Sequence, residues 1–189
     1  MAQKHKIAIF ASGNGSNFEA IARAAIGGEI EVEVALLVCD RPSARVVQIA
    51  QELGIASFVF SAKDYSSKQE FEQGIINRCN EAEVELICLA GYMRLVGETL
   101  LTAYEGRIIN IHPSLLPAFK GKDAIKQAFD YGVKVFGVTL HYVDLSLDGG
   151  KIIAQQAFDY SGQNIEELEE KFHTVEHTLY INTIKELLN

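Results

Sequence analysis

Short segments that are apolar at almost every position alternate along this chain with longer segments of helical periodicity. Strands of this kind are typical of a parallel sheet that helices cover on both faces. We predict strands at residues 6–11, 32–39, 56–60, 86–90 and 108–112. We predict helices that begin at residue 16 and that span residues 44–53, 67–82 and 98–104. The sequence therefore predicts an α/β fold, a Rossmann-like three-layer sandwich.

The C-terminal third has a different pattern. After a helix near residues 124–130, the segment 133–142 alternates in polarity, which predicts a half-exposed strand. The segment 152–158 can pair with it, and residues 165–188 form a long amphipathic helix. We therefore expect a mostly parallel sheet with an antiparallel C-terminal edge and a long C-terminal helix.

Length and composition limit the class of protein. With 189 residues, 48% of them hydrophobic, and no low-complexity tract, we expect residues 1–189 to form one domain. The formal net charge of -8 argues against a general nucleic-acid or anionic-membrane surface. No apolar run reaches the roughly 18 residues of a spanning helix, and residues 1–11 lack a secretory apolar region, so we expect a cytoplasmic protein.

The three cysteines, Cys39, Cys79 and Cys88, show no CxxC spacing. Two of them lie in apolar, strand-like runs, which favours buried free thiols in a reducing compartment. We expect no metal site.

Two polar side chains stand out in the apolar strand at 108–112, directly before Pro113. Alternation along a strand places Asn110 and His112 on the same face, and Pro113 and Pro117 favour a fixed loop after them. A carboxamide beside an imidazole suits a transition state with a developing oxyanion, since both can donate hydrogen bonds to it. A purely structural pair at a strand end remains an alternative.

A glycine-rich turn, residues 12–17 with the sequence SGNGSN, joins the first strand to the first helix. Ser16 and Glu19 have capping-box spacing, which predicts the helix start and leaves its first N–H groups facing the turn. Such a turn can bind a phosphate, although an ordinary strand–helix turn is the alternative. Phe18 stands where a dinucleotide fingerprint needs its third glycine, so NAD binding is disfavoured.

Three strand exits, at residues 12–17, 91–94 and 110–112, fall at the carboxyl edge of the predicted sheet, where ligands of such sheets bind. The segment 91–96 could line a pocket for a flat ligand, but from its residues alone we favour core packing.

Asp148, before Gly149 and Gly150, reads as a turn residue. If its loop folds back over the sheet edge, however, its carboxylate can reach His112 and favour the imidazolium form. Glu176 and His177 in the last helix read as solvated or structural.

The segment 110–117 reads NIHPSLLP, Asp148 precedes two glycines, and the turn 12–17 reads SGNGSN. Together these motifs resemble the folate-dependent formyltransferase family, and within it the phosphoribosylglycinamide formyltransferases (glycinamide ribonucleotide transformylases). The resemblance covers essentially the whole chain. The Asn-x-His and Asp set is shared by the wider group of 10-formyltetrahydrofolate transferases and hydrolases. The N-terminal turn, the His112-Pro113 junction and the absence of an extra domain point to the glycinamide ribonucleotide enzymes rather than to hydrolases or methionyl-tRNA formyltransferases. A nucleotide-binding regulatory module with a vestigial site is the alternative from another class.

The resemblance implies an enzyme of de novo purine biosynthesis that uses 10-formyltetrahydrofolate as co-substrate, needs no metal and works as a monomer or homodimer. It would transfer the formyl group to the primary amine of N1-(5-phosphoribosyl)glycinamide. The N-terminal part would bind the ribonucleotide phosphate, and the C-terminal part would bind folate and carry catalysis.

The resemblance also assigns residues, with Asn110, His112 and Asp148 as the catalytic set. The ribonucleotide would contact Gly15, Ser16, Asn17, His173, Thr174, Val175 and Glu176, with Glu176 holding the glycinamide amine. Folate would contact Lys68, Met93, Arg94, Leu95, Val96, Asn110, Asp144, Leu145, Ser146, Leu147 and Asp148. Lys68 stands where the family often has Arg, which replaces a bidentate fork with a point charge. Lys120 stands where relatives commonly have Pro.

Overall fold

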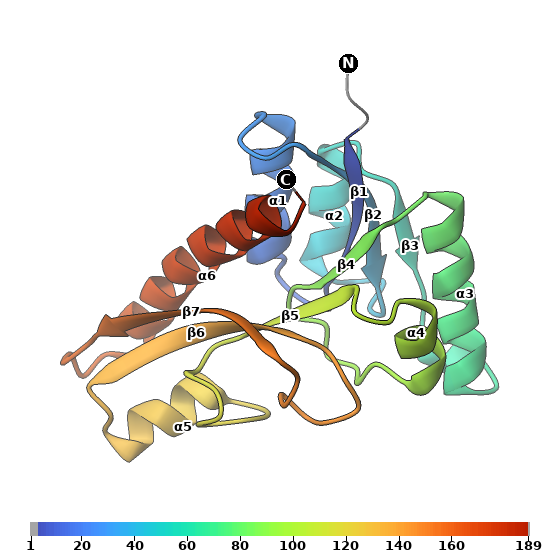
Figure 1. Ribbon diagram of the computed structural model, residues 1–189. Helices are drawn as coiled ribbons and strands as arrows, with labels where there is room; N and C mark the ends of the chain where they lie inside the picture. Colours follow the sequence, from blue (N-terminus) through green and yellow to red (C-terminus); the bar gives the residue numbers. More distant parts are fainter. Residues whose placement is uncertain (1–3, 189) are drawn as a thin grey trace.

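A seven-stranded sheet in the order β3-β2-β1-β4-β5-β6-β7 runs through the part of the chain that the computed structural model describes, residues 4–188 (Figure 1). The strands are β1 (His5–Phe10), β2 (Val32–Cys39), β3 (Ser57–Val59), β4 (Leu86–Leu89), β5 (Ile108–His112), β6 (Val135–Tyr142) and β7 (Ile152–Asp159). Neighbours from β3 to β5 are parallel, whereas β6 is antiparallel to both β5 and β7. The predicted mixed sheet with an antiparallel C-terminal edge is confirmed.

The helices also follow the sequence pattern closely. They are α1 (Ser16–Ile26), α2 (Arg45–Glu52), α3 (Lys68–Glu81), α4 (Glu98–Ala103), α5 (Ala124–Tyr131) and α6 (Ile165–Leu187), with a 3-10 turn η1 (Ala62–Asp64). Where a side-chain cap forms, it marks the start of the helix: Ser67 accepts from the amide of Glu70, and Asn164 accepts from those of Glu166 and Glu167. Most predicted boundaries lie within one residue of the observed ones.

Helices cover both faces of the sheet, as the three-layer prediction requires (Figure 1). In β1, Ile7 and Ile9 face the layer that contains α1, α2 and α6, while Ala8 and Phe10 face α3 and α4. All four are fully buried. Burying one large apolar side chain of this kind contributes about 1.5–3 kcal/mol relative to leaving it exposed, so the two cores stabilise the sheet from both sides.

The strand β6 is covered more completely than its alternation predicts. Residues 136–141 are buried at every position, so the expectation of a half-exposed strand is wrong. On one face Phe136 packs edge-on against Phe172 of α6. On the other, the loop after β5 lies so close that a Cβ on Gly137 would be 2.5 Å from Leu115. The face of β6 that carries the polar residues is therefore covered by the loop after β5 and does not face solvent.

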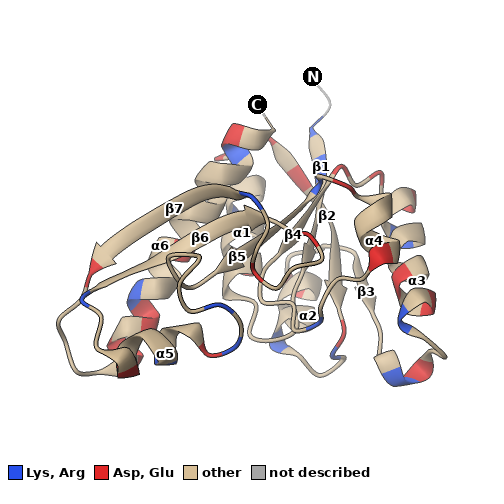
Figure 2. Cartoon of the chain, turned by 60° about the horizontal axis from the view of Figure 1, so that its bottom comes forward, with Lys and Arg blue, Asp and Glu red and all other residues tan. Residues whose placement is uncertain are grey.

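The three cysteines are buried free thiols, as predicted. Burial raises the pKa of Cys79 and of Cys88 to about 12, which leaves both as unreactive thiols. Charged residues lie mainly on helices and loops, while β6 carries none and β7 only its last residue (Figure 2). None of the helices within residues 4–188 combines the length and apolarity that crossing a membrane requires.

The strand order reverses between β1 and β4, because the chain runs outward to β3 before it returns to β4 on the other side of β1. At such a switch point the loops after the two strands diverge and leave a crevice beyond the carboxyl ends. The loops after β1 and β4, together with the end of β5, lie along this edge. The fold therefore brings residues 12–17, 91–94 and 110–112, the three predicted strand ends, to one edge of the sheet.

Candidate active site

The strand β5 carries its polar pair on one face, as alternation predicts. Asn110 lies opposite His141 of β6, and His112 lies opposite Thr139. His112 is 5% exposed, and Asn110 is half-buried. The two side chains therefore point the same way at the carboxyl end of the parallel part of the sheet.

The loop after β5 is held in place, and no helix or strand forms between residues 113 and 123. The hydroxyl of Thr139 donates to the carbonyl of Ser114 at 2.7 Å and accepts from the amide of Leu116 at 3.1 Å. Gln155 of β7 donates to the same hydroxyl and to the carbonyl of Leu116. The prediction of a fixed loop is confirmed.

Asp148 comes back to the sheet edge from the loop between β6 and β7. Its Oδ2 lies 3.5 Å from Nδ1 of His112 and accepts a 2.8 Å hydrogen bond from the amide of Gly121. The side chain is 11% exposed. The predicted approach of this carboxylate to His112 is confirmed, and Asp148 is also the turn residue that its position before two glycines indicates.

The backbone around Asp148 explains the double glycine. Asp148 itself has φ 46°, a left-handed conformation that aspartate tolerates better than most residues. A Cβ on Gly149 would lie 2.2 Å from the Ser146 hydroxyl oxygen, and one on Gly150 would lie 1.8 Å from the carbonyl oxygen of Tyr142. At Gly150 the overlap is with backbone, so only glycine fits, whereas at Gly149 the Ser146 hydroxyl would have to move. This turn delivers the carboxylate.

His112 has an oxygen acceptor at each ring nitrogen. Nε2 lies 2.9 Å from the carbonyl oxygen of Phe119, and Nδ1 faces Asp148. The two oxygens lie on opposite sides of the imidazole and so define the orientation of the ring.

A second histidine, His141, belongs to this cluster and was missed by the sequence reasoning. Its Nε2 lies 3.1 Å from Nδ2 of Asn110 and 3.8 Å from Oδ1 of Asp148. Burial lowers the pKa of His141, and its Nδ1 lies 2.9 Å from the carbonyl oxygen of Tyr142. A neutral ring with the proton on Nδ1 donates to Tyr142 and accepts from Asn110, which orients the carboxamide. The signal would have been the cross-strand register that pairs residue 110 with residue 141, which the sequence does not state.

The turn after β1 begins α1 differently from the prediction. The helix starts at Ser16 as expected, but the N-cap is Gly15, with φ 80°, and no side chain caps the helix. Instead of a capping box, the amide of Glu19 donates to the carbonyl of Gly15 at 2.8 Å. A Cβ on Gly15 would lie 2.7 Å from Val46, so glycine is required for space as well as for φ. The first helical N–H groups remain without side-chain caps, which suits an anion.

The predicted ribonucleotide residues of the first and last helices meet. Nδ2 of Asn17 donates to Oε2 of Glu176 at 3.1 Å, and Nδ1 of His173 lies 3.3 Å from the same oxygen. Glu176 is 7% exposed, so the solvated alternative for it is wrong. The Glu176 carboxylate raises the pKa of His173. Thr174 is exposed and Val175 is half-buried beside them.

The segment after β4 presents apolar side chains to solvent. Met93 is 66% and Leu95 is 69% exposed, so the expectation of simple core packing is wrong for both. Arg94 points elsewhere: its Nε donates to Oδ2 of Asp40 at 2.8 Å, and its guanidinium lies over the ring of Phe71. Val96 packs partly against the core around β4.

The remaining predicted folate residues lie in the loop 144–148 and at the start of α3. In the loop 144–148, Leu145 is 71% and Leu147 is 54% exposed, and Asp144 accepts from the amide of Ser146 at 2.8 Å. Lys68 is half-exposed at the start of α3, with its Nζ 4.0 Å from the buried carboxylate of Glu72. Lys120 is exposed in the loop before Gly121.

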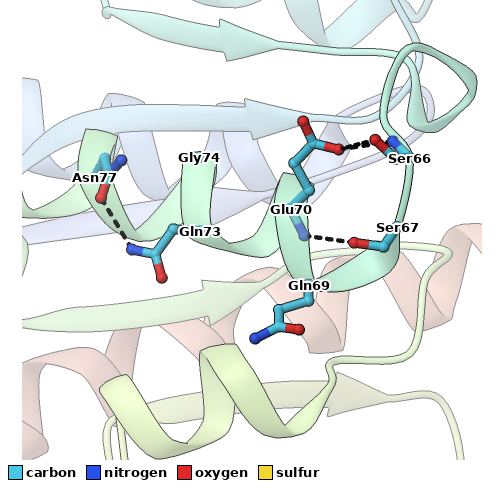
Figure 3. Close-up of a pocket in the computed structure, with 7 residues that line it drawn as sticks. All are labelled: Ser66, Ser67, Gln69, Glu70, Gln73, Gly74 and Asn77. Atoms are coloured by element: carbon cyan, nitrogen blue, oxygen red, sulfur yellow. Dashed lines mark hydrogen bonds between the residues drawn. The ribbon is translucent and has the colours of Figure 1, made fainter.

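A separate hollow of about 600 Å³ lies over the outer side of α3, lined by Ser66, Ser67, Gln69, Glu70, Gln73, Gly74 and Asn77 (Figure 3). Glu70 accepts from Ser66, the amide of Glu70 donates to Ser67, and Gln73 donates to Asn77 (Figure 3). The hollow contains none of the predicted site residues. Within residues 4–188 no group of three or more His, Cys, Asp or Glu side chains is placed to hold a metal ion.

The cluster of a carboxamide, two histidines and a carboxylate at the carboxyl edge of this α/β sheet has the donors that an oxyanion requires, as in enzymes that transfer an acyl-type group. The family model described as formyl transferase matches residues 5–184, and the chain therefore belongs to the formyl transferase family.

Bacterial relatives place the chain within that family. It is 54% identical to the phosphoribosylglycinamide formyltransferase of Bacillus subtilis (strain 168), over 97% of this chain and 94% of the relative. The crystal structure of glycinamide ribonucleotide transformylase 1 from Geobacillus kaustophilus has a TM-score of 0.96 and 53% identity, covering 99% of this chain and 100% of that one. The phosphoribosylglycinamide formyltransferase of Streptococcus pneumoniae TIGR4 has a TM-score of 0.91 and 41% identity, covering 98% and 99% of the two chains.

Similarity also extends to part of a longer protein. The chain is 38% identical to a segment of the trifunctional purine biosynthetic protein adenosine-3 of Gallus gallus, covering 94% of this chain and 18% of that protein.

Proposed function

We propose that this protein transfers the formyl group of 10-formyltetrahydrofolate to the primary amine of N1-(5-phosphoribosyl)glycinamide, giving the N-formyl product and tetrahydrofolate in purine biosynthesis. The observation that carries the proposal is the approach of Asp148 to His112 beside Asn110, in a chain 54% identical to a phosphoribosylglycinamide formyltransferase. The formyl donor is a co-substrate, and the proposed reaction uses no metal.

On the ribonucleotide side, the phosphate lies against Gly15, Ser16 and Asn17 at the N-terminus of α1. The uncapped N–H groups and the helix dipole both favour an anion there. Glu176, bonded to Asn17 and close to His173, holds the glycinamide amine, and Thr174 and Val175 complete this end.

On the folate side, the pterin ring lies between the segment 93–96 and the loop 144–148. Exposed apolar side chains from both segments supply the flat apolar contacts that such a ring needs. Lys68 supplies a positive charge for the glutamate tail of the folate.

The chemistry follows from the cluster at β5. The neutral substrate amine attacks the formyl carbon, a C–N bond forms, and the carbonyl oxygen becomes an oxyanion. Asn110, oriented by His141, and the charged His112 donate to that oxyanion, with His112 exchanging the Phe119 carbonyl for the substrate oxygen. The attacking nitrogen loses its proton and N10 of the folate gains one, through His112 or an ordered water, before N10 leaves.

Asp148 keeps His112 charged and oriented throughout this sequence. Holding both substrates in one crevice supplies further acceleration by proximity. No covalent enzyme intermediate is needed. We further propose that residues 1–189 act as one domain, in the cytoplasm, as a monomer or homodimer.

A direct assay tests the function. Purified protein is mixed with 10-formyltetrahydrofolate and N1-(5-phosphoribosyl)glycinamide, and formation of tetrahydrofolate is followed by absorbance. We expect turnover only with both substrates present. Tetrahydrofolate release without the ribonucleotide would indicate a hydrolase, and no release under either condition would refute an enzymatic role.

A further inference from the structure

The segment 92–97 after β4 has irregular backbone and two outward-facing apolar side chains, Met93 and Leu95. Neither a helix nor a strand ladder fixes its shape. Two buried carboxylates from other parts of the chain, Asp40 and Glu72, hydrogen-bond to this segment at opposite ends.

Asp40 anchors the first end. Its Oδ1 accepts from the hydroxyl of Ser12 at 2.5 Å, and its Oδ2 accepts from Nε of Arg94 at 2.8 Å. The same hydroxyl of Ser12 accepts from the amide of Met93 at 2.9 Å. Ser12 is 1% exposed and the Asp40 side chain 5%, so their charge-assisted bond is shielded from water, while the Arg94 side chain is 37% exposed.

Glu72 anchors the second end. Its Oε1 accepts from the amide of Gly97 at 2.6 Å, and its Oε2 accepts from the amide of Leu100 at 3.3 Å. The carboxylate therefore caps the start of α4 and fixes the residue at which the segment 92–97 ends. Its side chain is 3% exposed, and Lys68 stands 4.0 Å away.

These two carboxylates are costly groups to bury. An ionised carboxylate loses several kcal/mol of hydration on burial, and a neutral hydroxyl or amide could cap α4 at lower cost. Each carboxylate accepts one hydrogen bond from the segment 92–97 and a second from an element beside it, Ser12 in the turn after β1 for Asp40 and Leu100 in α4 for Glu72. A rigid segment is what a flat ligand requires, because each side chain ordered only on binding would lower the affinity.

We propose that Asp40 and Glu72 are positioning residues for formyl transfer: together they hold the segment 93–97 in the conformation that receives the pterin ring of the formyl donor. The inference rests on the proposed function, since that function places folate against this segment. Neither carboxylate touches the reacting atoms. Their effect is on donor binding rather than on the chemical step.

The test uses Asp40→Asn and Glu72→Gln in the full-length enzyme, which keep side-chain shape and remove the charge. A matched control is Glu70→Gln, which removes an exposed carboxylate two residues away on α3 that, among the described residues, accepts hydrogen bonds from Ser66 alone (Figure 3). We expect the KM for 10-formyltetrahydrofolate to rise about ten-fold in each test variant, as loss of a charge-assisted hydrogen bond predicts. The KM for the ribonucleotide and kcat should stay within about three-fold, and the control should match the wild type.

A double variant adds a second criterion. Because both carboxylates hold one segment, the combined rise in KM should be smaller than the product of the two single effects. A purely structural role would lower the thermal midpoint and leave the two KM values unchanged or shift them together, and either pattern would overturn the proposal.

Hydrogen exchange on the wild-type protein gives an independent measurement. Without substrates, the amides of Met93, Gly97 and Leu100 should exchange more slowly than that of Leu95, which has no such partner among the hydrogen bonds of the described residues. Fast exchange at all four amides would overturn the anchoring even if a variant failed to fold. Absence of formyl transfer by the wild type would instead refute the proposed function, and the exchange rates would still decide the anchoring.

Discussion

Replacement of Asp148 by asparagine should abolish most of the turnover while leaving both substrates bound. The carboxylate lies 3.5 Å from Nδ1 of His112, and the two side chains are 11% and 7% exposed. With an effective dielectric constant of about 20, two unit charges at this separation attract by roughly 5 kcal/mol. Asparagine keeps an oxygen that can accept from Gly121 but carries no charge. The His112 ring then loses the neighbouring negative charge.

We expect kcat to fall by about 10²–10³-fold, equivalent to about 2.7–4 kcal/mol, which lies within the electrostatic energy available. The two KM values should change by less than about three-fold, because the carboxylate acts in the transition state. Initial rates of tetrahydrofolate formation, measured while each substrate is varied in turn, separate the two effects.

A suitable control is Asp159→Asn, which removes an exposed carboxylate at the end of β7, away from the cluster. It should retain wild-type rates. If Asp148→Asn turned over normally but bound folate poorly, the carboxylate would be a folate ligand, and our account of His112 would be wrong.

Three further outcomes follow from the structure. Gly15→Ala should lower the free energy of unfolding by about 2–4 kcal/mol, through a left-handed φ and the overlap with Val46, and a urea titration showing less than about 0.5 kcal/mol would contradict this. Glu176→Gln should raise the KM for the ribonucleotide at least about ten-fold without changing that for folate, and equal changes in both would remove its assignment to the amine. Because the Glu176 carboxylate raises the pKa of His173, this pair stabilises the fold below the ordinary histidine value of 6.5, and the contribution is lost as the pH rises through the raised value. The stability difference between wild type and His173→Gln should therefore shrink from about pH 6 to about pH 8, and a difference that grows would refute the linkage.

Most helices and strands could be predicted because hydrophobic periodicity and capping residues depend only on neighbouring positions in the chain. The apolar run of β5, with Asn110 and His112 two residues apart, is enough to place both side chains on one face. The predicted start of the helix at Ser67 is likewise set within a few residues, because the Ser67 side chain accepts from the amide of Glu70. The approach of Asp148 could be predicted only by assuming that its loop turns back.

What the sequence did not provide depends on long-range register and burial. His141 enters the cluster because β6 pairs with β5 in one register, and a shift of one residue would turn it to the opposite face. Asp40 and Glu72 look like ordinary acidic residues until the fold buries them beside the segment 92–97. The predicted helix start at Ser16 is confirmed, but the predicted capping box of Ser16 and Glu19 is wrong. The N-cap is Gly15, which has a left-handed backbone and no side chain to cap the helix.

The hydrogen bond between Asn17 and Glu176 joins side chains 159 positions apart, one in the first helix and one in the last. A ribosome has therefore made all seven strands of the sheet before the second of these groups leaves the exit tunnel. The residues that we propose to bind the formyl donor are therefore all made before those that we propose to bind the acceptor amine are complete. A nascent chain interrupted before α6 would lack His173 and Glu176, so the proposed acceptor end is completed last.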